Sequence, residues 1–150
     1  MLFLWVNKRR SEPKERRKGI TNLNQDALIC SFKAASEKHA KDIQILDLRG
    51  ISDVADFFFL CSSLSSRQSR AIADEILESL RQIGYEPHHY EGYPDQGWIL
   101  IDYGDVIFHI FQEDLRAHYD LEGLWCDANR VKIPHLQLAS SQNQLQALTS

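Results

Sequence analysis

Apolar residues recur at the spacing of an α-helix in three stretches of the chain, residues 23–39, 65–84 and 112–125. The second stretch carries the clearest signals, because Ser65 and Gln68 form a capping-box pattern at its start and Gly84 suits its end. The third stretch restarts at Asp120, where we expect a second short helix. The side chains expected to face the core from this third stretch are Leu115, Tyr119 and Leu124 or Trp125.

Strand-like runs of apolar residues alternate with these helices. Residues 56–63 form a continuous apolar run, which is typical of a central strand buried on both faces, and residues 42–50 form a run before it. Residues 86–92 predict a weaker strand, and residues 97–112 predict a hairpin that turns at residues 103–104. This order of elements predicts an α/β fold with a mixed sheet covered by helices.

The composition is that of one ordinary globular domain. The chain has 150 residues, 43% of them hydrophobic and 25% charged, which is enough to bury a single core. No apolar run approaches the roughly 20 residues that cross a bilayer, so we expect no membrane span. The three cysteines, Cys30, Cys61 and Cys126, have no CxxC spacing and do not predict a disulfide scaffold.

Charge is distributed unevenly along the chain. Residues 1–19 carry seven Lys or Arg and two Glu, whereas residues 86–127 carry ten Asp or Glu and a single basic residue, Arg116. We interpret residues 1–19 as a disordered basic tail and residues 134–150 as a flexible Gln- and Ser-rich tail, on a domain that spans residues 20–133. Because an acidic surface repels phosphate backbones and attracts basic groups, the acidic segment predicts a basic protein partner and no direct nucleic-acid specificity.

No residue cluster predicts a catalytic, cofactor or metal site. Cys61 follows an apolar run and is expected to be a buried, unreactive thiol. The serines after it lack the glycines of a nucleophile elbow or a phosphate-binding loop, and we expect them to cap the next helix. The histidines and the paired carboxylates fit structural and turn roles. These serines are Ser62, Ser63, Ser65 and Ser66, and the paired carboxylates are Asp53 with Asp56 and Asp102 with Asp105.

Aromatic and acidic residues gather around the predicted hairpin. Trp98 begins its first strand beside Tyr93, and Tyr103 lies at its tip, positions where we expect aromatic rings to be half-exposed. The acids of the same neighbourhood are Glu91, Asp95, Asp102 and Asp105. Exposed aromatic rings among acids are typical of a protein-docking face. The alternative is a solvated acidic edge with Trp98 packed onto the core.

Two long segments resemble a known protein family. They are DLRGISDVADFFFLCSSLSSRQSRAIADEI, which starts at Asp47, and EGY with WILIDYGDVIFHIFQEDLRAHYDLEGLW, which start at Glu91 and Trp98. Together they are similar to the ribosomal silencing factor (Iojap) family, and the resemblance extends over residues 23–131. It implies a mixed α/β domain whose topology is like the nucleotidyltransferase fold but lacks its catalytic carboxylates.

The resemblance also implies a function. Members of this family are not enzymes; they bind the large ribosomal subunit through its fourteenth ribosomal protein, block joining of the small subunit and repress translation when nutrients are scarce. They are often homodimers when free. We expect no cofactor and a cytoplasmic location, with an organelle stroma or matrix as the other setting. Two alternatives stay open, a nucleotidyltransferase-like nucleotide-binding enzyme and a homodimeric adaptor for another basic protein.

Matching the family's motifs to this sequence assigns the docking residues. The motif of a Trp, three hydrophobic residues and an Asp implies docking roles for Trp98 and Asp102, and the turn that follows adds Gly104 and Asp105. Further positions that the resemblance places on or beside the face are Glu91, Tyr93, His109, Tyr119, Leu121, Glu122 and Trp125. The chain departs from the family at residues 63–68, where Ser-Leu-Ser-Ser-Arg-Gln replaces the usual Gly-Thr-Ser-Ser-Arg-His, so we expect this loop only to cap a helix.

Overall fold

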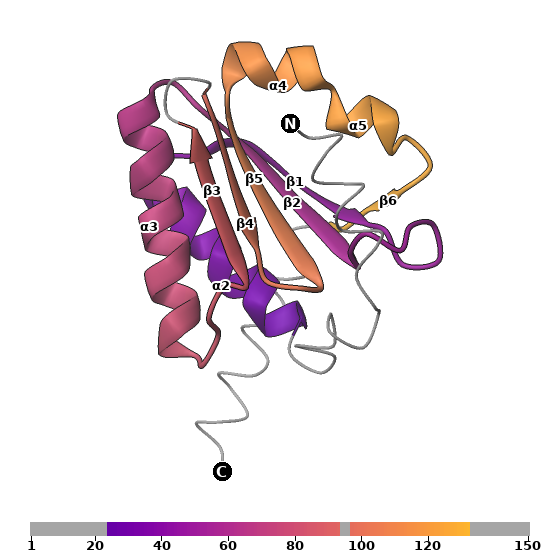
Figure 1. The fold of residues 1–150 in the computed structure, drawn as a ribbon, viewed down its shortest axis with the longest axis horizontal. Coiled ribbons are helices and arrows are strands. Elements are labelled where there is room, and N and C mark those ends of the chain that lie inside the picture. The colour runs from indigo at the N-terminus through magenta and orange to yellow at the C-terminus, as the bar shows by residue number, and fades with distance from the viewer. Residues whose placement is uncertain (1–23, 94–96, 133–150) are drawn as a thin grey trace.

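A six-stranded mixed sheet lies at the centre of the fold, with helices packed on it (Figure 1). The computed structural model describes residues 24–93 and 97–132. The elements follow in the order α2 (Asn24–Glu37), β1 (Lys41–Asp47), β2 (Phe57–Ser63), α3 (Ser66–Gln82), β3 (His89–Tyr93), β4 (Trp98–Asp102), β5 (Val106–Gln112), α4 (Glu113–Tyr119), α5 (Leu121–Leu124) and β6 (Asn129–Arg130). The predicted fold class is therefore confirmed. The predictions made for Asp95 and for the two tails lie outside the described residues.

Strand β2 is central, as its continuous apolar run predicts. The strand order is β3-β4-β5-β2-β1-β6, and every residue of β2 is buried. Strand β2 pairs with β5 in parallel, whereas its other neighbour, β1, is antiparallel. Strands β4 and β5 form the predicted antiparallel hairpin, and β3 adds to its outer side. The sheet is mixed because only the β2–β5 pair among the described strands is parallel.

The two faces of the sheet carry different helices. Helices α2 and α3 pack together on one face, and α4 and α5 lie at one end of the other face (Figure 1). Because side chains alternate along a strand, each strand contributes to both faces. The strand residues under α2 and α3 include Ile45, Phe59, Cys61, Ile99, Ile101, Phe108 and Ile110. Those of the opposite face include Leu46, Phe58, Leu60, Trp98, Leu100, Ile107 and Phe111.

Helix α3 begins with the predicted serine cap. The Ser65 hydroxyl accepts a hydrogen bond from the Gln68 backbone N–H at 3.1 Å, and Gln68 Oε1 accepts one from the Leu64 N–H at 2.8 Å. The Gln68 amide also donates to the carbonyl oxygens of Lys38 and His39, at 3.2 and 3.0 Å. The glutamine that replaces the family's histidine therefore ties the start of α3 to the turn after α2.

The predicted restart at Asp120 is confirmed, but the inward-facing leucine after it is not the expected one. Asp120 has a left-handed backbone (φ 45°, ψ 56°) and its side chain accepts from the Gly123 N–H, so it ends α4 and caps α5. This sharp turn directs Leu121 into the core, where it is 1% exposed, and leaves Leu124 63% exposed. The expectation that Leu124 faces inward is therefore wrong, whereas Leu115, Tyr119 and Trp125 pack against the core as predicted.

Candidate partner-binding face

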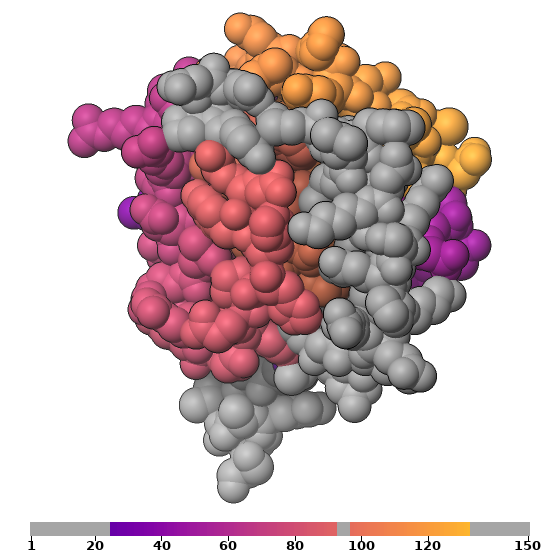
Figure 2. All heavy atoms as spheres, in the orientation of Figure 1, coloured from indigo at the N-terminus to yellow at the C-terminus, as the bar shows by residue number. Residues whose placement is uncertain are grey.

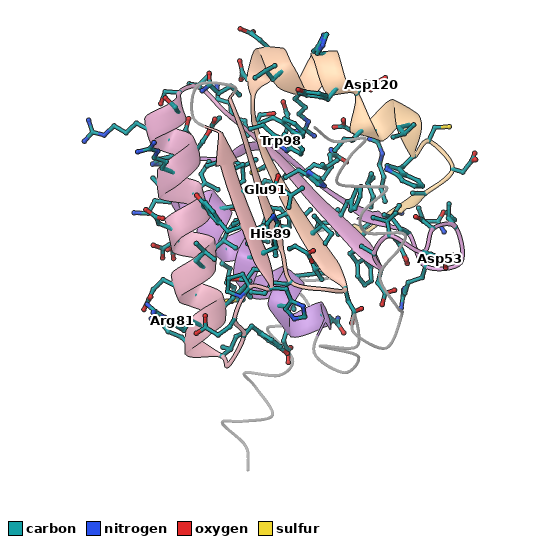
Figure 3. All side chains as sticks on the ribbon, in the orientation of Figure 1. Asp53, Arg81, His89, Glu91, Trp98 and Asp120 are labelled. Atoms are coloured by element: carbon teal, nitrogen blue, oxygen red, sulfur yellow. The ribbon has the colours of Figure 1, made fainter. Side chains whose placement is uncertain are left out.

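The strand register brings most of the predicted docking residues to one face of the sheet. Glu91 pairs with Leu100, Leu100 with His109, and the backbone of Tyr93 with Trp98. Directly paired residues of antiparallel strands lie on the same face. Glu91, Trp98 and His109 therefore share the face that lies opposite α2 and α3. Figure 3 shows Glu91 and Trp98 on this part of the sheet, with His89 further along β3.

Six aromatic side chains form a continuous layer on this face, which we call the aromatic layer: Phe58, Trp98, His109, Phe111, Tyr119 and Trp125. The Trp98 ring lies parallel to the rings of Phe111 and His109, with centroids 5.7 and 6.0 Å away. The ring of Tyr119, on α4, packs against that of Trp98, with the two ring centroids 5.7 Å apart. The Trp98 Nε1–H donates to His109 Nδ1 at 3.3 Å, so the layer is fixed by a hydrogen bond as well as by ring contacts.

The expectation that Trp98 and Tyr103 are half-exposed is wrong. Trp98 is 1% exposed and Tyr103 is 2% exposed. Trp98 is buried because strand alternation directs it onto the face where Phe111 and Tyr119 flank it, and Tyr103 because its ring packs edge-on against Phe108. Trp98 is thus part of the core, as the alternative interpretation held. The predicted docking residues that stay half-buried are Glu91, Asp105, Tyr119, Glu122 and Trp125.

Asp102, Gly104 and Asp105 lie together at the turn between β4 and β5. Asp102, which is buried, accepts a hydrogen bond from the Gly104 N–H at 2.7 Å, and Gly104 has a positive φ of 91° that suits glycine. The Asp105 carbonyl accepts from the N–H groups of Asp56 and Phe57, both at 2.9 Å. This turn lies about 13 Å along β4 from Trp98, so the two groups of predicted residues occupy opposite ends of the face.

The edge strand β3 and the helices α4 and α5 border the same face. Figure 2 shows β3 at the surface, with α4 and α5 along the upper edge of this side. On β3, His89 Nε2 donates to Glu91 Oε1 at 2.6 Å, since a carboxylate can only accept. On α5, Glu122 forms an ion pair with Arg116 at 2.6 Å. The Glu122 carboxylate is therefore already paired with a basic residue of the same chain. Tyr119 lies at the border of the aromatic layer.

Sequence reasoning did not identify Arg116 as a structural link. Its guanidinium also donates to the Asp42 carbonyl and to the Ser62 hydroxyl, so it joins α4 to two strands. The signal was present in the sequence, because Arg116 is the one basic residue among the ten acids of residues 86–127. A lone base in an acidic segment is a candidate for a specific ion pair.

Burial sets the ionisation of two candidate reactive groups. It raises the pKa of the Cys61 thiol to about 12, so this cysteine is protonated and unreactive at neutral pH, as predicted. It lowers the pKa of His109 to about 3, so the imidazole is neutral and its Nδ1 carries no proton and accepts the hydrogen bond from Trp98.

Within residues 24–93 and 97–132, no group of three or more His, Cys, Asp or Glu is arranged to hold a metal ion.

The groups that a nucleotidyltransferase-like site would need lie far apart. Asp53 and Asp56 come before β2, and the serine loop that begins at Ser63 comes after it. The length of β2 places these two groups about 20 Å apart. Figure 3 shows Asp53 on the loop that projects beyond the sheet.

A membrane span requires a helix of sufficient length and hydropathy. None of the helices in residues 24–93 and 97–132 meets both requirements.

These observations define a small mixed α/β domain with an aromatic layer on the sheet face opposite its two main helices. A family model described as "Ribosomal silencing factor during starvation" matches residues 21–149. The chain belongs to this family, as the sequence resemblance predicts.

Three relatives illustrate the similarity. The chain is 42% identical to the ribosomal silencing factor RsfS of Halalkalibacterium halodurans over 110 residues, which cover 73% of this chain and 94% of that one. It is 34% identical to the chloroplastic protein Iojap of Zea mays, over 74% of this chain and 50% of that one. A crystal structure from Bacillus halodurans has a TM-score of 0.64 and 39% identity, and the match covers 73% of this chain and 100% of that one.

Proposed function

We propose that this chain represses translation by binding the large ribosomal subunit through its fourteenth ribosomal protein, so that the small subunit cannot join. Membership of the ribosomal silencing factor family supports the ribosomal setting. The observation that carries the proposal is the placement of Glu91, Trp98 and His109 on one sheet face, with Tyr119 at its border. The docking residues are Trp98, Asp102, Asp105, Tyr93, Glu91, Gly104, His109, Tyr119 and Glu122.

Burial divides these residues into two roles. Glu91, Asp105 and Tyr119 are half-buried and supply contacts that the partner can reach. Trp98 and His109 are buried on the same sheet face and make the surface rigid, which lowers the entropy lost on binding. The acids of residues 86–127 match a basic ribosomal protein and steer its approach.

The remaining parts of the proposal follow from the family. The chain acts as a binding protein and not as an enzyme, and it is a homodimer when free. It works in a bacterial cytoplasm or in the stroma or matrix of an organelle. The similarity to a chloroplastic protein of Zea mays supports the organelle setting.

Co-sedimentation with isolated large ribosomal subunits tests the proposal. The chain is expected to move with the subunits and to reduce the yield of joined ribosomes when small subunits are added. Glu91→Lys on the docking face is expected to weaken binding about 3- to 10-fold, because it places a positive charge against a basic partner. Asp74→Lys is the matched control, since Asp74 is exposed on α3, on the opposite side of the sheet. A chain that stays at the top of the gradient at low salt would contradict the proposal, as would equal effects of the two variants.

A further inference from the structure

Arg116 connects four elements at the upper end of the docking face. It lies on α4, and its Nε and Nη2 atoms reach Glu122 Oε1 of α5 at 2.8 and 2.6 Å. Its Nη1 donates to Ser62 Oγ at the end of β2, at 2.9 Å, and to the Asp42 carbonyl of β1. The Arg116 side chain is only 11% exposed, so these charge-assisted bonds are largely shielded from water.

The two helices that Arg116 joins are short, and their side chains hold them on the sheet. Helix α4 has seven residues and none of them is buried, and α5 has four residues with Leu121 as its one buried side chain. Helices this short are not stable by themselves in water. The position of the α4–α5 pair therefore depends on side-chain contacts with the sheet. These are apolar packing, an ion pair of Glu113 with Lys41 Nζ at 3.9 Å, and the Arg116 bonds, which reach both β1 and β2.

The same helix pair carries the border of the aromatic layer. Tyr119, one turn after Arg116, lies 5.7 Å from Trp98 and 5.8 Å from Phe111. Trp125, directly after α5, meets the Phe58 ring edge-on at 6.0 Å. A shift of the helix pair would move both half-buried rings relative to the sheet.

Removal of Arg116 would also change the charge balance at this junction. Arg116 lines a pocket together with four acidic residues and with Arg130 as the other basic residue. The acids are Asp42, Glu113, Asp120 and Glu122, of which Glu113 also lies 3.9 Å from Lys41 Nζ. Arg130 donates to Gln44 Oε1 at 3.4 Å and is exposed, so it is bonded to the sheet and not to α4 or α5. Glu122 would then lose its basic partner, and the positive charge that offsets these acids at the junction between the helices and the sheet would fall.

From this geometry we infer that Arg116 is a positioning residue for partner binding. Its hydrogen bonds and ion pair, which we call the Arg116 latch, fix α4 and α5 to β1 and β2 and so hold Tyr119 and Trp125 in place on the docking face. This inference rests on the proposed function, in which the face binds the large subunit. It assigns Arg116 no contact with the partner.

Three variants of the full chain test the inference. Arg116→Met removes the latch, Arg116→Lys keeps the charge but cannot bond Glu122 and Ser62 with a planar fork, and Arg130→Met is the matched control from the same pocket. Hydrogen exchange of the free chain reports the helix position, and co-sedimentation with large subunits reports binding. We expect Arg116→Met to speed exchange in α4 and α5 at least tenfold while β2 and β5 stay protected, and to weaken binding at least tenfold. Arg116→Lys should lie between Arg116→Met and the wild type, and Arg130→Met within about twofold of the wild type.

Each other outcome overturns the inference. Unchanged exchange in α4 and α5 would show that Arg116 does not hold them, and faster exchange with unchanged binding would show that their position does not matter to the partner. An equal loss of protection in β2 and β5 would reveal a general stability effect. If Arg116→Met does not fold, Ser62→Ala, which removes the hydrogen bond from Arg116 to β2 and is not one of the predicted docking residues, replaces it with the same criteria. If the wild type itself does not bind large subunits, the proposed function fails, whereas the exchange data still decide whether the latch exists.

Discussion

His109 is the residue whose ionisation the fold restricts most clearly. Its buried ring is neutral in the folded chain because burial lowers its pKa to about 3, whereas the unfolded chain titrates near the ordinary value of 6.5. Below that value the unfolded state binds more protons, so the free energy of unfolding must fall as the pH falls. We expect His109 to contribute a loss of about 2 kcal/mol between about pH 6 and about pH 4.5.

Urea unfolding of the wild type and of His109→Gln over this pH range measures the contribution. The glutamine keeps an acceptor for the Trp98 N–H but does not titrate, so its stability should depend less on pH. Parallel pH dependences of the two proteins would contradict the prediction.

Asp102 is expected to act first as a turn residue. It is buried and accepts from the Gly104 N–H at 2.7 Å, so Asp102→Ala leaves that donor without this acceptor and should cost about 1–3 kcal/mol of unfolding free energy. Asp102→Asn keeps a carbonyl oxygen at the same place and should cost less than about 1 kcal/mol. Urea denaturation of both variants measures the difference. Equal losses would mean that the charge, and not the hydrogen bond to Gly104, determines the stability of the turn.

At the residue scale, the sequence predicted which residues share the face better than it predicted their exposure. The family resemblance placed Glu91, Trp98 and His109 on or beside one face, and they do lie on one face, because directly paired residues of antiparallel strands share it. The burial of Trp98 depends on Tyr119, which comes from a helix that follows later in the chain, and no local pattern reveals that contact. Exposure is a property of the packed molecule, so the position of Trp98 next to a loop was a poor guide to it.

At the scale of elements, the N-terminal cap of α3 is a clear test of a sequence signal. The Ser65 hydroxyl accepts from the Gln68 N–H, whereas Ser66, the next residue, is the first of the helix. Ser65→Ala should lower the free energy of unfolding by about 1 kcal/mol through loss of the cap, and Ser66→Ala by less than about 0.5 kcal/mol. Thermal or urea unfolding of the two alanine variants checks the prediction. A larger loss of unfolding free energy from Ser66→Ala than from Ser65→Ala would mean that Ser66, and not Ser65, caps the helix.

The elements that the sequence predicted well are those with strong local signals. Residues 56–63 predict a buried central strand, and β2 is that strand, because only a strand covered on both faces tolerates a continuous apolar run. The short α5 was harder, because one left-handed residue, Asp120, decides whether Leu121 or Leu124 turns inward. The contacts of Arg116 with Asp42 and Ser62 join residues more than 50 positions apart, which periodicity cannot predict.

At the scale of the whole molecule, the four acids predicted to dock the partner do not form a single compact patch. The Asp102–Asp105 turn lies at one end of the sheet face, Glu91 lies on its edge strand, and Glu122 pairs with Arg116 at the other end. The sequence predicted the sign of the charge on this part of the molecule but not its separation into three locations. A basic partner that fits this face must therefore meet the acids over the length of β4, about 13 Å, and not at one point.

This distribution predicts how ionic strength affects the proposed binding to the large subunit. Glu91 is half-buried at the surface of an edge strand, so its interaction with a basic partner should be screened by salt. The affinity gap between the wild type and Glu91→Lys should be about 3- to 10-fold at about 0.05 M salt and should close to within about twofold at about 0.5 M, where the Debye length is about 4 Å. Asp74→Lys, on the opposite face, should show no gap at either concentration.

Co-sedimentation at several salt concentrations measures these gaps for both variants. Comparison of variants at each concentration removes the effect of salt on the ribosomal subunit itself, because that effect is common to all the proteins. A gap for Glu91→Lys that persists at high salt would contradict a screened interaction at the border of the face. It would instead place Glu91 in a desolvated ion pair at the centre of the interface, since buried pairs are screened much less than exposed ones.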